Sequence, residues 1–143
     1  MRKHFYMVGL NILNQILRHD PDVIMIGELR NEHTAQIALK LALTGHLVLT
    51  TLHAGDGKSA LKRLLTLGLQ EDDLKEILLA VITQRLFYSK ADHEPFVIFE
   101  ILEKEHIIAT INNDVMTITP LLDKIRKAYQ EGRLSEDDYE RYA

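Results

Sequence analysis

Two short apolar runs separated by a helical segment constrain the fold of this 143-residue chain more than any other feature. The runs are Val23-Ile-Met-Ile26 and Leu47-Val-Leu-Thr-Thr-Leu52, and each is typical of a strand buried on both faces. Residues 31–43 between them carry apolar side chains at helical spacing, and Gly45 suits the end of that helix. Strand, helix and strand in so few residues predict a parallel sheet covered by helices. The expected fold class is therefore α/β.

The rest of the chain adds helices and one expected pair of strands. The expected elements are helices at 8–17, 59–67 and 71–87, strands at 96–102 and 106–111 around a Lys104-Glu105 turn, and terminal helices at 120–131 and 135–142. Ser135 and Asp138 fit a capping box at the start of the last helix.

Composition excludes several classes of protein. The chain has no cysteine, which excludes disulfides and thiolate metal sites. Its formal net charge of -4 gives no electrostatic reason to expect nucleic acid or an anionic membrane as a direct partner. No run approaches the roughly 18 apolar residues that a membrane span needs.

Glu28 and His53 are the candidate chemical groups, because each follows one of the two apolar runs. Ligands of open α/β sheets bind beyond the carboxyl ends of the strands, so the two side chains are expected to face one cleft. A carboxylate there can orient or deprotonate an attacking water, and a histidine can contact a terminal phosphate. The alternative is a solvated acid and a loop histidine without chemistry, because short motifs give false positives.

A metal site is a weaker interpretation of the histidines. His46 and His53 stand at opposite ends of the second strand, and seven residues at roughly 3.3 Å each place them more than about 20 Å apart. We therefore interpret His46 as a residue of the helix-to-strand turn. A metal hydrolase built on His19, Glu28 and His53 is disfavoured because the three show no close ligand spacing.

The tripeptide Gly57-Lys58-Ser59 imitates the end of a phosphate-binding loop. A true loop needs a first glycine five residues before Gly57, where this chain has Leu52, and Asp56 would place a negative charge among the phosphates. We predict that the tripeptide is a decoy and that Ser59 is the N-cap of a helix.

The stretch Leu17-Arg-His-Asp-Pro-Asp-Val-Ile-Met-Ile-Gly-Glu28 resembles the Walker B region of the secretion traffic ATPases, the motors of type II secretion, type IV pili and competence pseudopili. Thr44-Gly-His-Leu-Val-Leu-Thr-Thr-Leu-His53 resembles the His box of that family, and Gln84-Arg85-Leu86 and Phe99-Glu100-Ile101-Leu102 extend the match. Ala54 and the lack of a cysteine-rich insertion are most similar to the competence branch of Gram-positive bacteria.

The resemblance implies a partial RecA-like ATPase domain over residues 1–111 and a small helical subdomain over residues 112–143. It implies that Glu28 is the catalytic carboxylate and that His53, His46 and Arg30 belong to the nucleotide site, with His46 in a positioning role and Arg30 in a structural or coupling role. ATP and Mg²⁺ are the expected substrate and ion, and no resident metal site is expected.

The resemblance also implies a homohexamer that works at the inner face of the cell membrane, in the cytoplasm, on a polytopic platform protein. The family's P-loop and acidic box lie upstream of Walker B, and no such motif precedes Leu17, so we expect the C-terminal part of a motor that does not hydrolyse ATP alone. Asn31 and His33 replace acidic residues of the family at a helix start. The alternative function is a non-catalytic assembly module of the same machinery.

Overall fold

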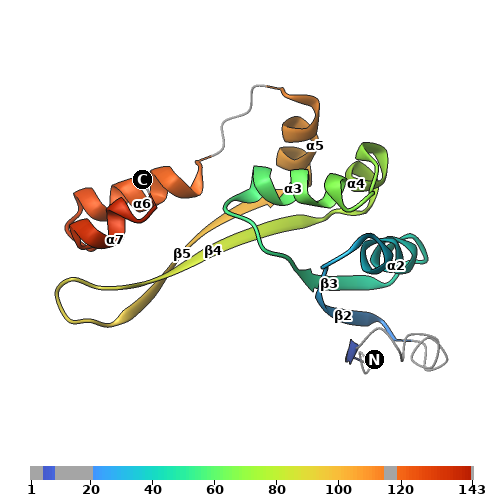
Figure 1. Cartoon of the computed structure of the whole chain (residues 1–143), viewed down its shortest axis with the longest axis horizontal. Coiled ribbons are helices and arrows are strands. Elements are labelled where there is room, and N and C mark those ends of the chain that lie inside the picture. Colours follow the sequence, from blue (N-terminus) through green and yellow to red (C-terminus); the bar gives the residue numbers. More distant parts are fainter. Residues whose placement is uncertain (1–4, 9–20, 115–118, 143) are drawn as a thin grey trace. The chain divides into compact units, whose positions relative to one another are not determined.

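The structure is a computed structural model that describes residues 5–8, 21–114 and 119–142. The chain forms two compact units (Figure 1). The first contains residues 1–53 and 60–78, and the second contains residues 54–59 and 79–143. The predicted boundary between residues 111 and 112 concerns functional domains and stays a prediction.

The first unit is built on a parallel three-stranded sheet with the strand order β1-β2-β3. The strands are β1 (Phe5–Val8), β2 (Val23–Glu28) and β3 (Leu47–Thr51). Helix α2 (Glu32–Leu43) connects β2 to β3 and packs against β3 (Figure 1). Both strands and this helix confirm the prediction. The sequence did not indicate β1, which contains Val8, and the rest of the helix predicted over 8–17 lies outside the described residues.

Strands β2 and β3 differ in how far they are buried. Ile24 and Ile26 of β2 are almost inaccessible, with exposed fractions of 1% and 2%. Leu47 and Leu49 of β3 are each 44% exposed. The prediction that β3 is buried on both faces is therefore wrong, because β3 is the edge of the described sheet and pairs only with β2 in this unit.

Local sequence explains the ends of the helices in the first unit. The side chain of Asn31 accepts a hydrogen bond from the Thr34 amide at 3.0 Å and so caps α2. Gly45 follows that helix with a φ of +91°, and Gly68 plays the same part after α3 (Gly57–Thr66) with a φ of +85°. Helix α4 (Glu71–Ile77) completes the unit. Leu61 and Leu64 of α3, Leu67 just after it and Leu74 of α4 are buried.

The second unit is built on an antiparallel hairpin of β4 (Ala80–Tyr88) and β5 (Pro95–Glu103). The helix predicted over 71–87 is therefore wrong beyond Ile77, where α4 ends. Residues 80–88 contain Val81, Ile82 and Thr83, whose branched β-carbons favour a strand, and all nine residues of β4 pair with β5. Pairing with β5 makes residues 80–88 a strand, and the apolar run alone does not show that this pairing occurs.

The strand predicted over 106–111 and its Lys104-Glu105 turn are also wrong, because this segment is helix α5 (Lys104–Asn112). The helix ends in Asn113, which has a φ of +58°. Ile107 is fully buried, and α5 packs on both strands of the hairpin. The predicted partner of the strand at 96–102 was the segment 106–111, but in the structure β5 pairs with β4 instead.

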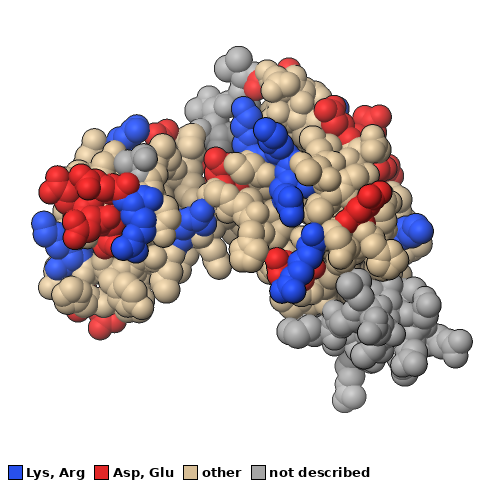
Figure 2. Space-filling model, in the orientation of Figure 1, with Lys and Arg blue, Asp and Glu red and all other residues tan. Residues whose placement is uncertain are grey.

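The two predicted terminal helices are confirmed as α6 (Leu121–Gln130) and α7 (Glu136–Glu140). Ser135 caps α7 by accepting a hydrogen bond from the Asp138 amide at 3.1 Å. Acidic side chains gather over α7 (Figure 2), and Glu136 and Asp137 join Asp138 in its first turn. The buried core of this unit consists of Phe87, Ile98, Leu121, Ile125, Ala128 and Leu134.

Candidate functional site

A bulge at the carboxyl end of β2 directs the side chain of Glu28. Ile26 pairs with Thr50 and Glu28 pairs with Thr51, so Gly27 is an extra residue on β2. A bulge bends the strand and turns the next side chain, which is how strand ends often present functional groups. The carboxylate of Glu28 therefore lies at the end of the ladder and keeps a side-chain exposure of 25%.

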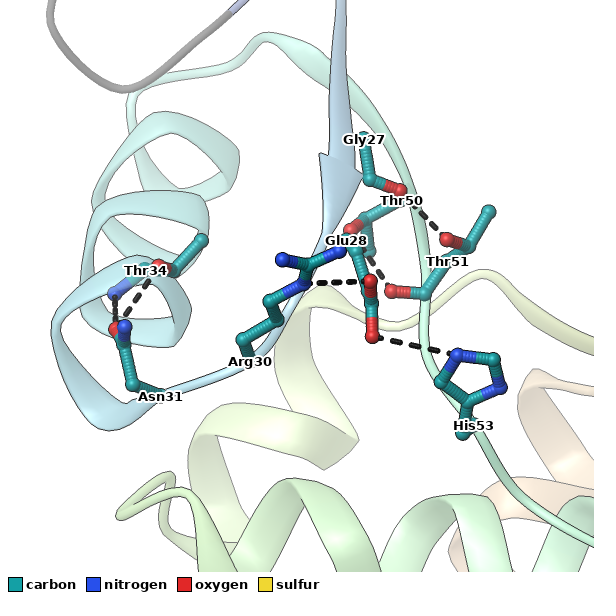
Figure 3. A network of polar contacts seen from close by, with 8 residues as sticks. All are labelled: Gly27, Glu28, Arg30, Asn31, Thr34, Thr50, Thr51 and His53. Carbon is teal, nitrogen blue, oxygen red and sulfur yellow. Dashed lines mark hydrogen bonds and ion pairs between the residues drawn. The ribbon is translucent and has the colours of Figure 1, made fainter.

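Two cationic or potentially cationic side chains approach the two oxygens of Glu28 (Figure 3). The Nε of Arg30 donates to Oε2 at 2.7 Å, and Nε2 of His53 lies 3.5 Å from Oε1. Both partners are open to solvent, with side-chain exposures of 77% for Arg30 and 96% for His53. The structure thus brings together Glu28, His53 and Arg30, three of the residues that the sequence predicted. Their roles stay predictions.

Arg30 changes the pKa of the Glu28 carboxylate. The hydrogen bond from Arg30 lowers the pKa of Glu28, and the charges of Arg30 and His53 act in the same direction against the opposing effect of desolvation. Glu28 is therefore ionised at neutral pH. An ionised carboxylate of low basicity is better suited to orient a water molecule than to hold its proton through a reaction.

The site lacks the donors of a resident metal. Among the described residues, no group of three histidine, aspartate or glutamate side chains lies close enough to hold an ion. Glu28 is the carboxylate of the cluster, while Arg30 and His53 supply donors that suit an anionic group. The arrangement can bind and orient a phosphate and a water.

The structure does not bring His46 to this cluster. Its Nδ1 lies 3.1 Å from the Thr44 hydroxyl and 3.2 Å from the Leu41 carbonyl, in the turn between α2 and β3. His46 precedes the first residue of β3, whereas His53 follows its last residue. The interpretation of His46 as a turn residue is confirmed, and its part in a nucleotide site stays a prediction.

The tripeptide Gly57-Lys58-Ser59 begins α3. The predicted N-cap is wrong: the carboxylate of Asp56 accepts the Ser59 amide at 2.6 Å, so Asp56 is the cap and Ser59 stands three residues later. The amide of Gly57 donates to the Glu100 carboxylate at 2.6 Å. A carboxylate therefore already occupies the amide that a phosphate would need, as expected for a decoy.

Sequence reasoning missed the capping role of Asp56 and the bulge at Gly27. An aspartate before Gly-Lys-Ser is itself a signal for an N-cap, because its carboxylate reaches the amide three residues ahead. The glycine before Glu28 marks a bulge only once the pairing with β3 is known.

The sequence matches the family model described as type II/IV secretion system protein over residues 6–126. The protein transport protein HofB homolog of Haemophilus influenzae is 56% identical over 82 residues, which cover 55% of this chain and 18% of the relative. The competence protein ComGA of Bacillus subtilis is 50% identical over 74 residues, covering 52% of this chain and 21% of the relative. The matched part is thus about a fifth of these relatives.

Among solved structures, the chain is similar to the pilus retraction motor PilT with bound ADP, with a TM-score of 0.72 and 27% identity. The match covers 93% of this chain and 43% of that one. The ATPase DotB of Legionella pneumophila has a TM-score of 0.69 at 24% identity. These likenesses confirm the predicted RecA-like α/β fold. Within the described part of the chain, no helix is long and apolar enough to cross a membrane.

Proposed function

Because the chain belongs to the type II/IV secretion system protein family, we propose that it supplies the catalytic carboxylate and the phosphate-facing histidine of an ATP-driven motor for secretion, pilus assembly or competence. Glu28 ends the Walker B strand in this proposal, and His53 ends the strand of the His box. In this proposal the chain alone does not turn over ATP, because the cluster of Glu28, Arg30 and His53 is not itself a cradle of backbone amides for the phosphates.

One observation carries this proposal: the Glu28 carboxylate and the His53 ring lie 3.5 Å apart beyond two paired parallel strands. Bound ligands of α/β sheets occupy that end of the strands. The PilT structure, whose fold this chain shares, contains ADP. The geometry and the comparison both support a nucleotide as the proposed ligand.

Each residue has a separate part in the proposed chemistry. Glu28 orients the attacking water, and its low pKa keeps it ionised while it does so. His53 contacts the terminal phosphate, where a donor stabilises the charge that develops on the phosphate oxygens. Arg30 holds the Glu28 carboxylate in place through its 2.7 Å hydrogen bond. His46 holds the turn that leads into β3.

The substrate is ATP, and Mg²⁺ would bind with it. Mg²⁺ usually keeps several waters and binds through one or two carboxylates together with substrate phosphates, so a single carboxylate near a phosphate fits it. When bound, the ion would neutralise charge on the phosphates. Among the described residues, Glu28 is the carboxylate that would face such an ion.

The motor proposed here is a homohexamer in the cytoplasm that acts at the inner face of the membrane on a polytopic platform protein. Its direct partners are proteins and not nucleic acid. The support is the membership of the chain in a family of secretion system proteins and its likeness to a pilus motor.

One observation favours a second function, as a non-catalytic assembly module of the same machinery. The open face of the hairpin exposes large apolar side chains, including Ile82 at 64%, Leu86 at 58% and Phe99 at 49%. Monomeric proteins seldom leave such a contiguous apolar surface open to water. An assembly module would use this surface and would not need Glu28.

Calorimetric titration of the chain with Mg-ATP tests the proposal first. We expect no saturable heat at micromolar nucleotide, because the donors that the structure brings to Glu28 are the Arg30 and His53 side chains, which do not form a cradle of backbone amides and a lysine for the phosphates. A chimera in which this chain replaces the matching segment of Bacillus subtilis ComGA should bind and hydrolyse ATP. A one-site isotherm from the chain alone would show that the site is complete here. A folded hexameric chimera that binds ATP without hydrolysing it would favour the assembly module.

A further inference from the structure

The hairpin of the second unit has one covered face and one open face, because side chains alternate along each of its two strands. Helices α5 and α6 pack against the hairpin. The buried side chains of the covered face are Thr83, Phe87, Ile98, Glu100 and Leu102. Within the described part of the second unit, no element covers the opposite face. Its large apolar side chains have exposed fractions between 40% and 64% and are Ile82, Leu86, Tyr88, Val97, Phe99 and Ile101.

These six side chains form one continuous patch, which we call the open hairpin face. Residues that are directly opposite one another in an antiparallel ladder have β-carbons about 5 Å apart, so their side chains are in contact. A monomeric protein seldom exposes a contiguous apolar patch larger than a few hundred Å². The cross-strand pairs at the centre of the patch are Ile82 with Ile101, Gln84 with Phe99, and Leu86 with Val97.

The size of the open hairpin face is sufficient for a protein interface. A large apolar side chain that is about half exposed leaves roughly 100 Å² open to solvent. Six such side chains present roughly 600 Å², and a second surface of the same size brings the buried total to about 1,200 Å². Specific and stable interfaces begin at about that total.

The distribution of charge favours a second copy of the same face as the partner. The chain has a formal net charge of -4, so two copies repel one another in most orientations. Residues 82–88 and 95–101 contribute no charged side chain to the open hairpin face. Lys124 of α6 borders the face, where its Nζ donates to the Phe99 carbonyl at 2.9 Å. Two copies therefore meet through this face without like charges at its centre.

The open hairpin face is also complementary to itself. A two-fold axis that lies in the interface, perpendicular to the strands at Gln84 and Phe99, places each end of one hairpin against the opposite end of the other. Gln84 then meets the same residue of the second copy, and the two amide groups can donate to and accept from each other. The aromatic ring of Phe99 likewise meets its own copy. Two sheets that pack face to face bury their apolar sides in this way.

We propose that the open hairpin face binds a second copy of this chain through a two-fold interface centred on Gln84 and Phe99. A two-fold interface joins identical surfaces and gives a closed dimer. A ring of six subunits instead joins two different surfaces of each subunit, so this interface is additional to the contacts of the proposed hexamer. The proposal depends neither on Glu28 nor on a nucleotide.

A single introduced cysteine tests the interface in the full chain, which has no cysteine of its own. Gln84→Cys should form a disulfide-linked dimer under mild oxidation, because the axis brings the two copies of this position together. Gln130→Cys, at an exposed position of α6, is the matched control and should stay largely unlinked. Analytical ultracentrifugation of the chain without substitutions should show a monomer and a dimer in a concentration-dependent equilibrium.

Substitution of Gln84 by charged residues provides an independent test. Gln84→Glu and Gln84→Lys each place like charges against one another at the axis and should weaken dimerisation at least tenfold. An equimolar mixture of the two variants should dimerise again, because opposite charges then meet. Gln130→Glu should dimerise as the parent does. Circular dichroism checks that each variant is folded.

Three results would overturn the proposal. A chain that sediments as a monomer at every concentration would show that the open hairpin face has a different occupant, such as the first unit of the same chain. Equal cross-linking of Gln84→Cys and Gln130→Cys would indicate random encounters between chains. Dimers of Gln84→Glu that are as stable as those of the parent would place the interface elsewhere.

Discussion

Glu28, at the end of β2, and Glu100, on the buried face of β5, have very different surroundings. Glu28 keeps 25% of its side chain exposed and has one hydrogen bond, whereas Glu100 is 5% exposed and accepts three. A buried carboxyl group needs hydrogen bonds from the protein, whereas an exposed one is hydrated and remains free to bind a ligand. The comparison separates a carboxylate available for chemistry from one used to fix the fold.

The largest expected difference between the two glutamates is in stability. Glu100→Ala leaves two buried helix amides without acceptors, which costs on the order of 1–3 kcal/mol for each group. The second unit should therefore melt at a clearly lower temperature. Glu28→Ala removes a solvent-facing ion pair and should leave the melting temperature unchanged. Thermal unfolding followed by circular dichroism measures the melting temperatures of both variants. An equal decrease in the two would contradict the difference proposed between Glu28 and Glu100.

Two glycines extend the comparison to the main chain. Gly57→Ala forces a methyl group against Glu100 and Leu102 and should cost about 1–3 kcal/mol of unfolding free energy. Gly27→Ala places its β-carbon where no atom lies within 4 Å, so it should stay within about 1 kcal/mol of the parent. Urea titrations measure both. A neutral Gly57→Ala would mean that the close approach of α3 to β5 is not real.

The start of α3 gives a smaller effect. Asp56→Ala removes the N-cap and should cost about 1 kcal/mol, whereas Lys58→Ala and Ser59→Ala should each stay within roughly 0.5 kcal/mol. Lys58→Ala should also leave ATP affinity of the ComGA chimera within a few-fold. Lost ATP binding in Lys58→Ala with an unchanged melt would place the phosphates at α3 after all.

The smallest effect is on the titration of Glu28. Arg30 lowers the pKa of Glu28 below its ordinary value of 4.5, so Arg30→Gln should raise it toward 4.5. Because the pKa of Glu28 is lower in the folded protein than in the unfolded one, its pairing with Arg30 stabilises the fold at pH values above the ordinary pKa. This stabilisation is lost as the pH falls through the pKa of the folded protein. Carboxyl chemical shifts followed against pH measure both proteins. An unchanged pKa of Glu28 in Arg30→Gln would show that Arg30 does not interact with Glu28.

The elements of residues 21–53 were predicted well because the local signals for each helix and strand agree with the fold, although β3 is more exposed than its apolar run indicated. Helix α2 has a cap at Asn31 and a left-handed glycine at Gly45, and the strand before it ends in the predicted Glu28. The meeting of Glu28 and His53 followed from one rule about strand ends. The contact with Arg30 did not, because it depends on the bulge at Gly27.

Residues 71–111 were predicted poorly because tertiary contacts decide their structure. The apolar residues after Leu74 fit helical spacing as well as strand alternation, and only pairing with β5 selects β4. The segment from His106 to Ile111 has the β-branched composition of a strand but packs as a helix on the hairpin. The hydrogen bonds from the Gly57 and Leu121 amides to Glu100 could not be foreseen, since they require the covered face of β5 to be known.

The measurement that tests the central claim most directly is the turnover number of the ComGA chimera with Glu28→Gln. The amide keeps the size of the carboxylate but lacks its negative charge and one acceptor oxygen, so it orients the attacking water poorly and kcat should fall by about 10²-fold or more while ATP binding is retained. Glu32→Gln, an exposed change in the first turn of α2, is the matched control and should keep the full rate. Wild-type turnover by a folded Glu28→Gln chimera would contradict the assignment of Glu28 as the catalytic carboxylate.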